Sequence, residues 1–234
     1  MTKFSTIFFD LDNTLFDHHH SSLMGLSALQ SEYSPLKEQS LSALERAYWD
    51  LLNHNYNRIL SGEISMQDAR QERMKHYLAH FDVQVDDQEA KTAVSLYRTA
   101  YEANLRTVPG AEEVLDTLNG RFQLAIITNG LTQYQSQKLA DLKLQSYFSH
   151  VFTSEAVGSK KPEARIFETA LQAVNITAET AVMVGDDWDS DVIGSSKVGL
   201  TAVWLNRFNE TKPTTKNVHE IQNLSELITT IGDN

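Results

Sequence analysis

The sequence contains no cysteine in its 234 residues. This absence excludes disulfides, thiolate nucleophiles and cysteine-ligated metals, and it favours a reducing compartment such as the cytoplasm. Long apolar runs are missing as well, and the opening stretch "MTKFSTIFFDLD" has too short an apolar segment for a signal peptide. We therefore expect a cytoplasmic protein with no membrane partner.

Basic residues are scarce. The chain has 20 lysines and arginines against 31 aspartates and glutamates, which gives a formal net charge of −11. This charge argues against a nucleic-acid polymer or an anionic membrane as the main partner, and an anionic substrate would need a local positive centre. The length is enough for one sizeable domain, or for a core domain with a smaller insertion, and we expect a monomer or a homodimer.

Short and almost continuously apolar runs predict the strands of a sheet. Such runs are typical of strands that are covered on both faces, as in a parallel sheet. Helical patterns lie between them, and this alternation predicts an α/β fold with a three-layer, Rossmann-like parallel sheet core. The predicted strands are residues 5–9, 122–128, 181–185 and 200–205, with 150–154 as a weaker candidate.

Residues 17–105 interrupt this alternation. They contain long amphipathic patterns and no convincing strand. A helical block of this length is too long for a simple crossover between two strands. We therefore predict an all-helical cap domain at 17–105, inserted into an α/β core made of residues 1–16 and 106–234.

Polar residues follow three of the predicted strands. The carboxyl ends of parallel strands meet at one edge of a sheet, which is where ligands bind in such folds. Taken alone, each position is better explained as a turn or a helix cap, but their meeting at one edge favours a site. These residues are Asp10, Thr128 with Asn129, and Asp186.

The stretch "DLDNT" places Asp10 and Asp12 two residues apart. If the strand geometry continues, their side chains point to the same side of the chain. Two ionised carboxylates there repel each other and raise each other's pKa unless a cation lies between them. Mg²⁺, which prefers oxygen ligands, satisfies this requirement, and Asp186 is a candidate third ligand.

Lys161 directly precedes Pro162, which is predicted to begin a helix. A lysine at a helix N-terminus opposes the helix dipole and is slightly unfavourable for stability. An isolated lysine of this kind is best explained as a solvated surface residue. Because three other polar positions are predicted at the same edge, we interpret Lys161 as a contact for a phosphate group.

Four motifs in order make the chain resemble a phosphatase of the haloacid dehalogenase superfamily. The motifs are "DLDNT" at 10–14, "TN" at 128–129, "KKP" at 160–162 and "GDDWDSD" at 185–191. The predicted helical insertion resembles the cap of the subfamily in which the cap lies between the first two motifs. Within that subfamily, the chain is most similar to the branch of nucleoside monophosphate phosphatases.

The resemblance implies a catalytic mechanism. Asp10 would attack phosphorus and form an aspartyl-phosphate. Asp12 would protonate the leaving group and then activate the water that hydrolyses the intermediate. Lys161 would stabilise the nucleophile and the phosphoryl charge, and Thr128 would complete the catalytic set by holding the phosphate near a helix N-terminus.

The resemblance also implies the ligands of the metal and of the substrate. Mg²⁺ would be held by the Asp10 side chain, the Asp12 backbone carbonyl and Asp186. Asp191 would lie just outside the residues that bind the metal directly, and it would orient Lys161 or a water on the metal. The residues that would bind the phosphorylated substrate are Asp10, Thr128, Asn129 and Lys161.

Two other functions remain open in the sequence. A phosphomutase would keep the same catalytic residues, and a catalytically idle relative would only bind a ligand. The 2-haloacid dehalogenases resemble this family but lack the second aspartate of the first motif, so Asp12 favours phosphoryl transfer. The substrate is expected to be a small phosphorylated metabolite, plausibly a nucleoside monophosphate, chosen by residues of the cap. Candidate aromatic residues there are Tyr48, Trp49, Tyr56, Tyr77, Tyr97 and Tyr101.

Overall fold

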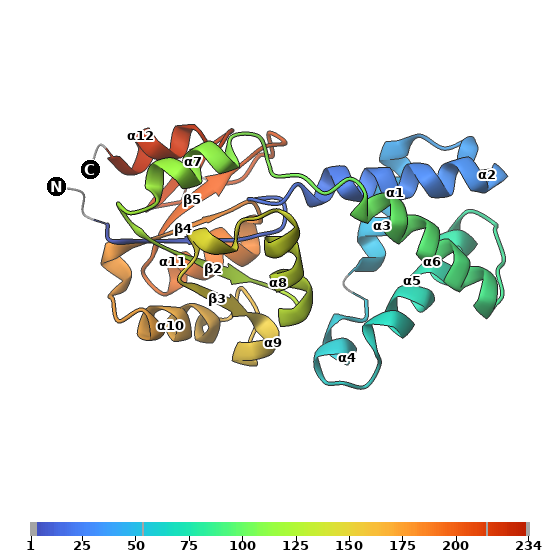
Figure 1. Ribbon diagram of the computed structural model, residues 1–234, viewed down its shortest axis with the longest axis horizontal. Helices are drawn as coiled ribbons and strands as arrows, with labels where there is room; N and C mark the ends of the chain where they lie inside the picture. Colours follow the sequence, from blue (N-terminus) through green and yellow to red (C-terminus); the bar gives the residue numbers. More distant parts are fainter. Residues whose placement is uncertain (1–3, 53, 214, 233–234) are drawn as a thin grey trace. The chain divides into compact units, whose positions relative to one another are not determined.

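The computed structural model describes residues 4–52, 54–213 and 215–232, and these form two compact units (Figure 1). The helical unit is His18–Arg106, and the described residues on either side of it form the core unit. None of the described helices combines the length and the apolar character that crossing a membrane requires.

The core unit is built on a parallel sheet, with strand order β3-β2-β1-β4-β5-β6 in the described part of the chain. The first strand of the sequence lies inside the sheet, and all four of its residues are buried. The strands are β1 (Thr6–Phe9), β2 (Gln123–Thr128), β3 (His150–Thr153), β4 (Ala181–Gly185), β5 (Thr201–Leu205) and β6 (Val218–Ile221).

Five of these strands were predicted, whereas β6 was not. β6 is an edge strand in which His219 and Glu220 are exposed. It therefore lacks the continuous apolar run by which the inner strands were recognised.

Helices cover both faces of the sheet, and the predicted three-layer α/β fold is confirmed. Figure 1 shows α7 and α12 on one face and α10 on the other. On the second face, Phe167 of α10 packs in one cluster with Phe8 of β1 and Met183 of β4. The helices of the core unit are α7 (Ala111–Leu118), α8 (Thr132–Asp141), α9 (Ser154–Val157), α10 (Ala164–Ala173), α11 (Gly194–Lys197) and α12 (Glu226–Gly232), with the short turns η1 (Gln145–Tyr147), η2 (Ala178–Thr180) and η3 (Trp188–Ile193).

The start of α10 differs from the prediction. The helix begins at Ala164 with Glu163 as its N-cap, and not at Pro162. The reason is a tight turn before the helix, in which the N–H of Glu163 donates to the carbonyl of Lys160 over 2.8 Å. Lys161 therefore lies in a turn that precedes the helix, and its charge does not oppose the first helical turn.

The helical unit contains six helices and no strand among its described residues. Four of the six candidate aromatic residues are buried and form its interior. Tyr48 stacks on Tyr97 with ring centroids 4.9 Å apart, and its edge meets Tyr77 at 5.4 Å. The helices are α1 (His18–Glu32), α2 (Ser34–Lys37), α3 (Leu41–Leu52), α4 (Tyr56–Leu60), α5 (Met66–His80) and α6 (Asp87–Glu102).

An ion pair fixes the end of the first core segment. The Asp17 carboxylate is almost fully buried, and Nη2 of Arg207 lies 3.1 Å from its Oδ1. The same guanidinium donates through Nη1 to the backbone carbonyl of Asn13 over 3.2 Å. Arg207 therefore ties the segment that follows β1 to the loop that follows β5.

Replacing Arg207 by Leu is expected to lower the free energy of unfolding by about 3 kcal/mol, because it removes a cation from a buried carboxylate. Urea denaturation followed by tryptophan fluorescence measures this change. Lys212→Leu is the matched control, since Lys212 pairs with an exposed Glu210, and we expect a loss below about 0.5 kcal/mol there. Equal losses in the two variants would show that Arg207 does not anchor this segment.

Candidate active site

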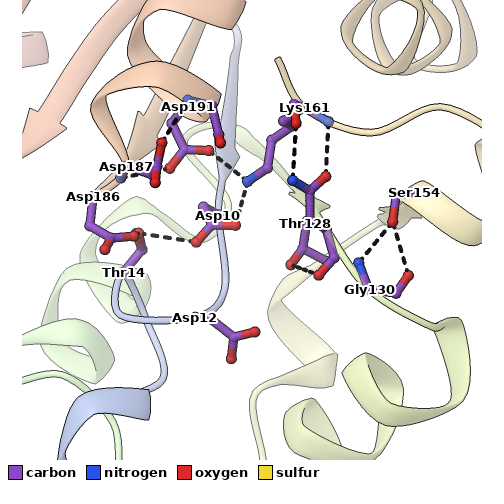
Figure 2. A network of polar contacts seen from close by, with 12 residues as sticks. Asp10, Asp12, Thr14, Thr128, Gly130, Ser154, Lys161, Asp186, Asp187 and Asp191 are labelled. Atoms are coloured by element: carbon purple, nitrogen blue, oxygen red, sulfur yellow. Dashed lines mark hydrogen bonds and ion pairs between the residues drawn. The ribbon is translucent and has the colours of Figure 1, made fainter. Parts of the chain in front are cut away.

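Asp10 and Lys161 form the centre of the site in the core unit. Asp10 directly follows β1, and Lys161 lies in the turn before α10. The Nζ atom of Lys161 is 2.5 Å from Oδ1 of Asp10 and 2.6 Å from Oδ1 of Asp191 (Figure 2). All three side chains are buried, so this ammonium forms ion pairs with two carboxylates in a place with little water.

Asp191 reaches Lys161 because of the residue type at the end of β4. A Cβ atom on Gly185 would lie 2.2 Å from Oδ2 of Asp191, so only glycine fits here. The same Oδ2 accepts a hydrogen bond of 3.1 Å from the N–H of Asp187. The side chain of Asp187 in turn caps η3 by accepting from the N–H of Ser190 over 2.7 Å.

Asp186 completes an acidic group at this edge of the sheet. The hydroxyl of Thr14 lies 3.3 Å from Oδ1 of Asp186 and 3.4 Å from Oδ2 of Asp10 (Figure 2). Thr14 belongs to the stretch "DLDNT", but the sequence argument gave it no role. The structure shows that its hydroxyl links the ends of β1 and β4.

The three carboxylates carry more negative charge than Lys161 can balance. Burial raises the pKa of Asp10, and it raises the pKa of Asp191 to about 7. Burial and the nearby charge of Asp10 together raise the pKa of Asp186 well above its usual value. Burial opposes the charged form of Lys161, but its two carboxylate partners outweigh burial and raise its pKa. Three carboxylates and one ammonium leave two uncompensated negative charges if all are ionised.

The donor set fits a divalent cation. One carboxylate oxygen from each of Asp10, Asp186 and Asp191 lies within 4.8 Å of the others. Oxygen ligands at this spacing suit Mg²⁺, and its two positive charges would match the local excess. The group contains the two predicted side-chain ligands, Asp10 and Asp186, and adds the carboxylate of Asp191, while the predicted ligand at Asp12 is its backbone carbonyl.

The carboxylate of Asp12 lies away from this group. β1 ends at Phe9, so strand alternation does not extend to Asp12. Nζ of Lys138 lies 2.5 Å and 2.8 Å from the two Asp12 oxygens, and Nε2 of Gln135 donates to Oδ2 over 3.2 Å. Each of these two carboxylates therefore has a lysine beside it, and the expected cation between Asp10 and Asp12 stays a prediction. Lys161 faces the first and Lys138 faces the second.

The end of β2 positions Lys161 through Asn129. The Asn129 amide accepts from the N–H of Lys161 over 2.8 Å and donates to its carbonyl over 3.1 Å. The buried hydroxyl of Thr128 accepts from Nε2 of Gln135 over 3.0 Å. The Asn129 side chain thus holds the backbone that carries Lys161, while its predicted contact with the substrate stays a prediction.

Two backbone N–H groups at the start of α8 already have partners. The N–H of Gly130 donates to the hydroxyl of Ser154 over 2.8 Å, and the N–H of Thr132 donates to Glu155 over 2.9 Å. A phosphate bound at this helix N-terminus would have to compete with these partners. The predicted role of Thr128 in holding the phosphate stays a prediction.

Sequence reasoning missed Gln135 and Lys138. They lie three residues apart on α8 and so share one face of that helix. Polar residues at this spacing are usual on a solvated helix face, so the pattern gave no signal for a site. Only the fold shows that this face meets Asp12.

Comparison with known proteins agrees with this geometry. The family model of haloacid dehalogenase-like hydrolases matches residues 4–199. A glyceraldehyde 3-phosphate phosphatase of Pyrococcus abyssi is 33% identical over 200 residues, which are 85% of this chain and 80% of that protein. The pyrimidine 5'-nucleotidase YjjG of Escherichia coli is 30% identical over 235 residues, covering 95% of this chain and 98% of its own length.

A solved structure gives the same fold over the whole chain. The putative HAD-hydrolase YfnB of Bacillus subtilis, crystallised with magnesium, superposes with a TM-score of 0.76 and 23% identity. The match covers 97% of this chain and 98% of that one. The present chain therefore belongs to the haloacid dehalogenase-like hydrolases and is an enzyme of that family, as its four motifs predicted.

Proposed function

We propose that the protein is a Mg²⁺-dependent phosphomonoester hydrolase that works through an aspartyl-phosphate on Asp10. The observation that carries this proposal is the 2.5 Å contact between the buried side chains of Lys161 and Asp10, beside the carboxylates of buried Asp191 and half-buried Asp186. A carboxylate held by an ammonium beside a divalent-cation site is suited to attack a phosphoryl group. The relatives named as a phosphatase and a nucleotidase support the same reaction class.

In the first step an oxygen of Asp10 attacks phosphorus, and the bond from phosphorus to the leaving oxygen breaks. That oxygen keeps the bonding electrons and takes a proton from the Asp12 carboxyl group. In the second step Asp12 takes a proton from water, the water oxygen bonds to phosphorus, and the carboxylate of Asp10 is released. The proton gained by Asp12 in one turnover balances the proton that it gives in the next.

Lys161 and the acidic group prepare this chemistry. Lys161 holds Asp10 in place and balances charge that develops on the phosphoryl oxygens, and Asp191 and Asn129 fix Lys161. Mg²⁺ would be held by Asp10 and Asp186, with the predicted Asp12 carbonyl, and would supply positive charge to the phosphoryl group.

We propose a nucleoside monophosphate as the substrate class. The nucleotidase YjjG matches the chain over nearly its full length, including the residues of the helical unit. Within that unit, most of the candidate tyrosines are buried against one another, whereas Trp49 is 38% exposed and can meet a base. We further propose that the helical unit selects the substrate and that the protein acts in the cytoplasm.

Phosphatase activity on p-nitrophenyl phosphate is expected with Mg²⁺ and should fall at least about 100-fold when EDTA removes the metal. Restoring Mg²⁺ in excess should recover the rate. Phosphate release from UMP, AMP and glyceraldehyde 3-phosphate then defines the substrate class through kcat/KM. No release from any of these with Mg²⁺ would contradict the proposal, and turnover of a sugar phosphate without phosphate release would indicate a phosphomutase.

A further inference from the structure

Asp12 is held by two side chains of α8. Lys138 contacts both oxygens of the carboxylate, at 2.5 Å and 2.8 Å, and Gln135 donates to one of them over 3.2 Å. Figure 2 shows the Asp12 side chain apart from the network of Asp10, Lys161 and Asp191. The proposed nucleophile and the proposed proton carrier therefore have separate cationic partners.

The two α8 side chains are themselves fixed. Nζ of Lys138 lies 5.3 Å from the ring centroid of Phe16, a fully buried residue that follows the Asp12 loop. Gln135 is buried, and its Nε2 also donates to the carbonyl of Asn129 over 2.7 Å. Gly130 has a φ of +140°, which favours glycine, and a Cβ atom there would lie 2.8 Å from the same Nε2, so glycine at this position leaves room for Gln135.

We propose that Lys138 and Gln135 are positioning residues that hold the Asp12 carboxyl group in the orientation from which it transfers a proton. This inference rests on the proposed function, in which Asp12 protonates the leaving oxygen. A proton carrier must lie within hydrogen-bond reach of that oxygen, and a freely rotating carboxyl group spends little time there. Lys138 restrains both oxygens at once, and Gln135 restrains one of them.

The consequence depends on the leaving group. The alkoxide released from UMP or glyceraldehyde 3-phosphate is a poor leaving group and needs the proton from Asp12. The nitrophenolate released from p-nitrophenyl phosphate is stable as an anion and needs it little. Loss of the positioning residues therefore slows the first step far more for alkyl phosphates than for p-nitrophenyl phosphate. The second step, in which Asp12 takes a proton from water, is the same for both substrates.

Lys138→Met is expected to lower kcat/KM, which reports the first step, by about 100-fold for the better alkyl phosphate and by less than about 5-fold for p-nitrophenyl phosphate. Gln135→Met should show the same selectivity with a smaller loss, and Lys138→Arg should recover part of the rate. Gln137→Met is the matched control, because Gln137 is exposed on the same helix and its amide donates to the exposed carboxylate of Asp141. It should leave both rates unchanged.

A double-mutant cycle isolates the effect on Asp12. In an Asp12→Asn background, adding Lys138→Met should cost less than about 2-fold, since no carboxyl proton remains to be positioned. Equal losses of kcat/KM on both substrates, or full additivity with Asp12→Asn, would overturn the inference. A wild-type enzyme that hydrolyses neither substrate would instead refute the proposed function, so the two failures are distinguishable.

Discussion

Replacing Asp10 by Asn is expected to lower kcat on p-nitrophenyl phosphate by at least about 10⁴-fold, because the amide is a poor nucleophile and cannot form the phosphorylated intermediate. The substitution keeps the size of the side chain. It also removes one of the buried carboxylates, so the fold should survive with Lys161 still paired to Asp191. The variant should therefore be inactive and folded.

Steady-state kinetics with Mg²⁺ measure this effect, and circular dichroism shows whether the variant is folded. Asp141→Asn is a matched control, since Asp141 is exposed at the end of α8 and contacts only Gln137 among the described hydrogen bonds. Its rate should equal that of the wild type. A folded Asp10→Asn variant that keeps its rate would remove Asp10 from the mechanism.

Replacing Asp186 by Asn is expected to move stability and activity in opposite directions. Burial, Asp10 and Asp191 all raise the pKa of Asp186, so its ionised form is unfavourable in the metal-free protein. Removing this charge should stabilise the metal-free protein by about 1 kcal/mol, which corresponds to a rise in Tm of about 2–4 °C. Activity with Mg²⁺ should fall by about 10³-fold, because a metal ligand is lost.

Thermal unfolding with and without Mg²⁺ separates the two effects. The wild type should gain stability when Mg²⁺ is added, because the metal binds the folded state, and the variant should lose most of this gain. Asp189→Asn is the control, since Asp189 is exposed in η3, which follows Asp186, and lies outside the acidic group. A lower metal-free Tm in Asp186→Asn, together with an unchanged response to Mg²⁺, would contradict a metal site at this edge.

The buried part of the fold was predictable because its physical signal is local. β1 and β4 are almost continuously apolar, and each is directly followed by an aspartate, so the sheet and the meeting of Asp10 with Asp186 followed from the sequence. β6 was not predicted, because an edge strand with exposed His219 and Glu220 has no continuous apolar run.

The directions of side chains were not predictable in the same way. Asp12 was expected to share a cation with Asp10, but the chain leaves strand geometry after Phe9 and turns the carboxylate of Asp12 to Lys138. Asp191 was expected one layer outside the metal ligands, and the structure places one of its carboxylate oxygens within 4.8 Å of those of Asp10 and Asp186, with glycine at position 185 leaving room for it. Both outcomes depend on contacts between segments that are distant in the sequence.

The most direct test of the account is to locate the phosphoryl group during turnover. The wild-type enzyme with Mg²⁺ is mixed with its best substrate, quenched in acid within one turnover, digested and mapped by mass spectrometry. We predict a phosphoryl group on the Asp10 side chain, and none in Asp10→Asn. A phosphoryl group on another residue would contradict the assignment of Asp10 as the nucleophile. So would an unmodified Asp10 in an enzyme whose first step is fast and whose second step is slow, because the intermediate should then accumulate.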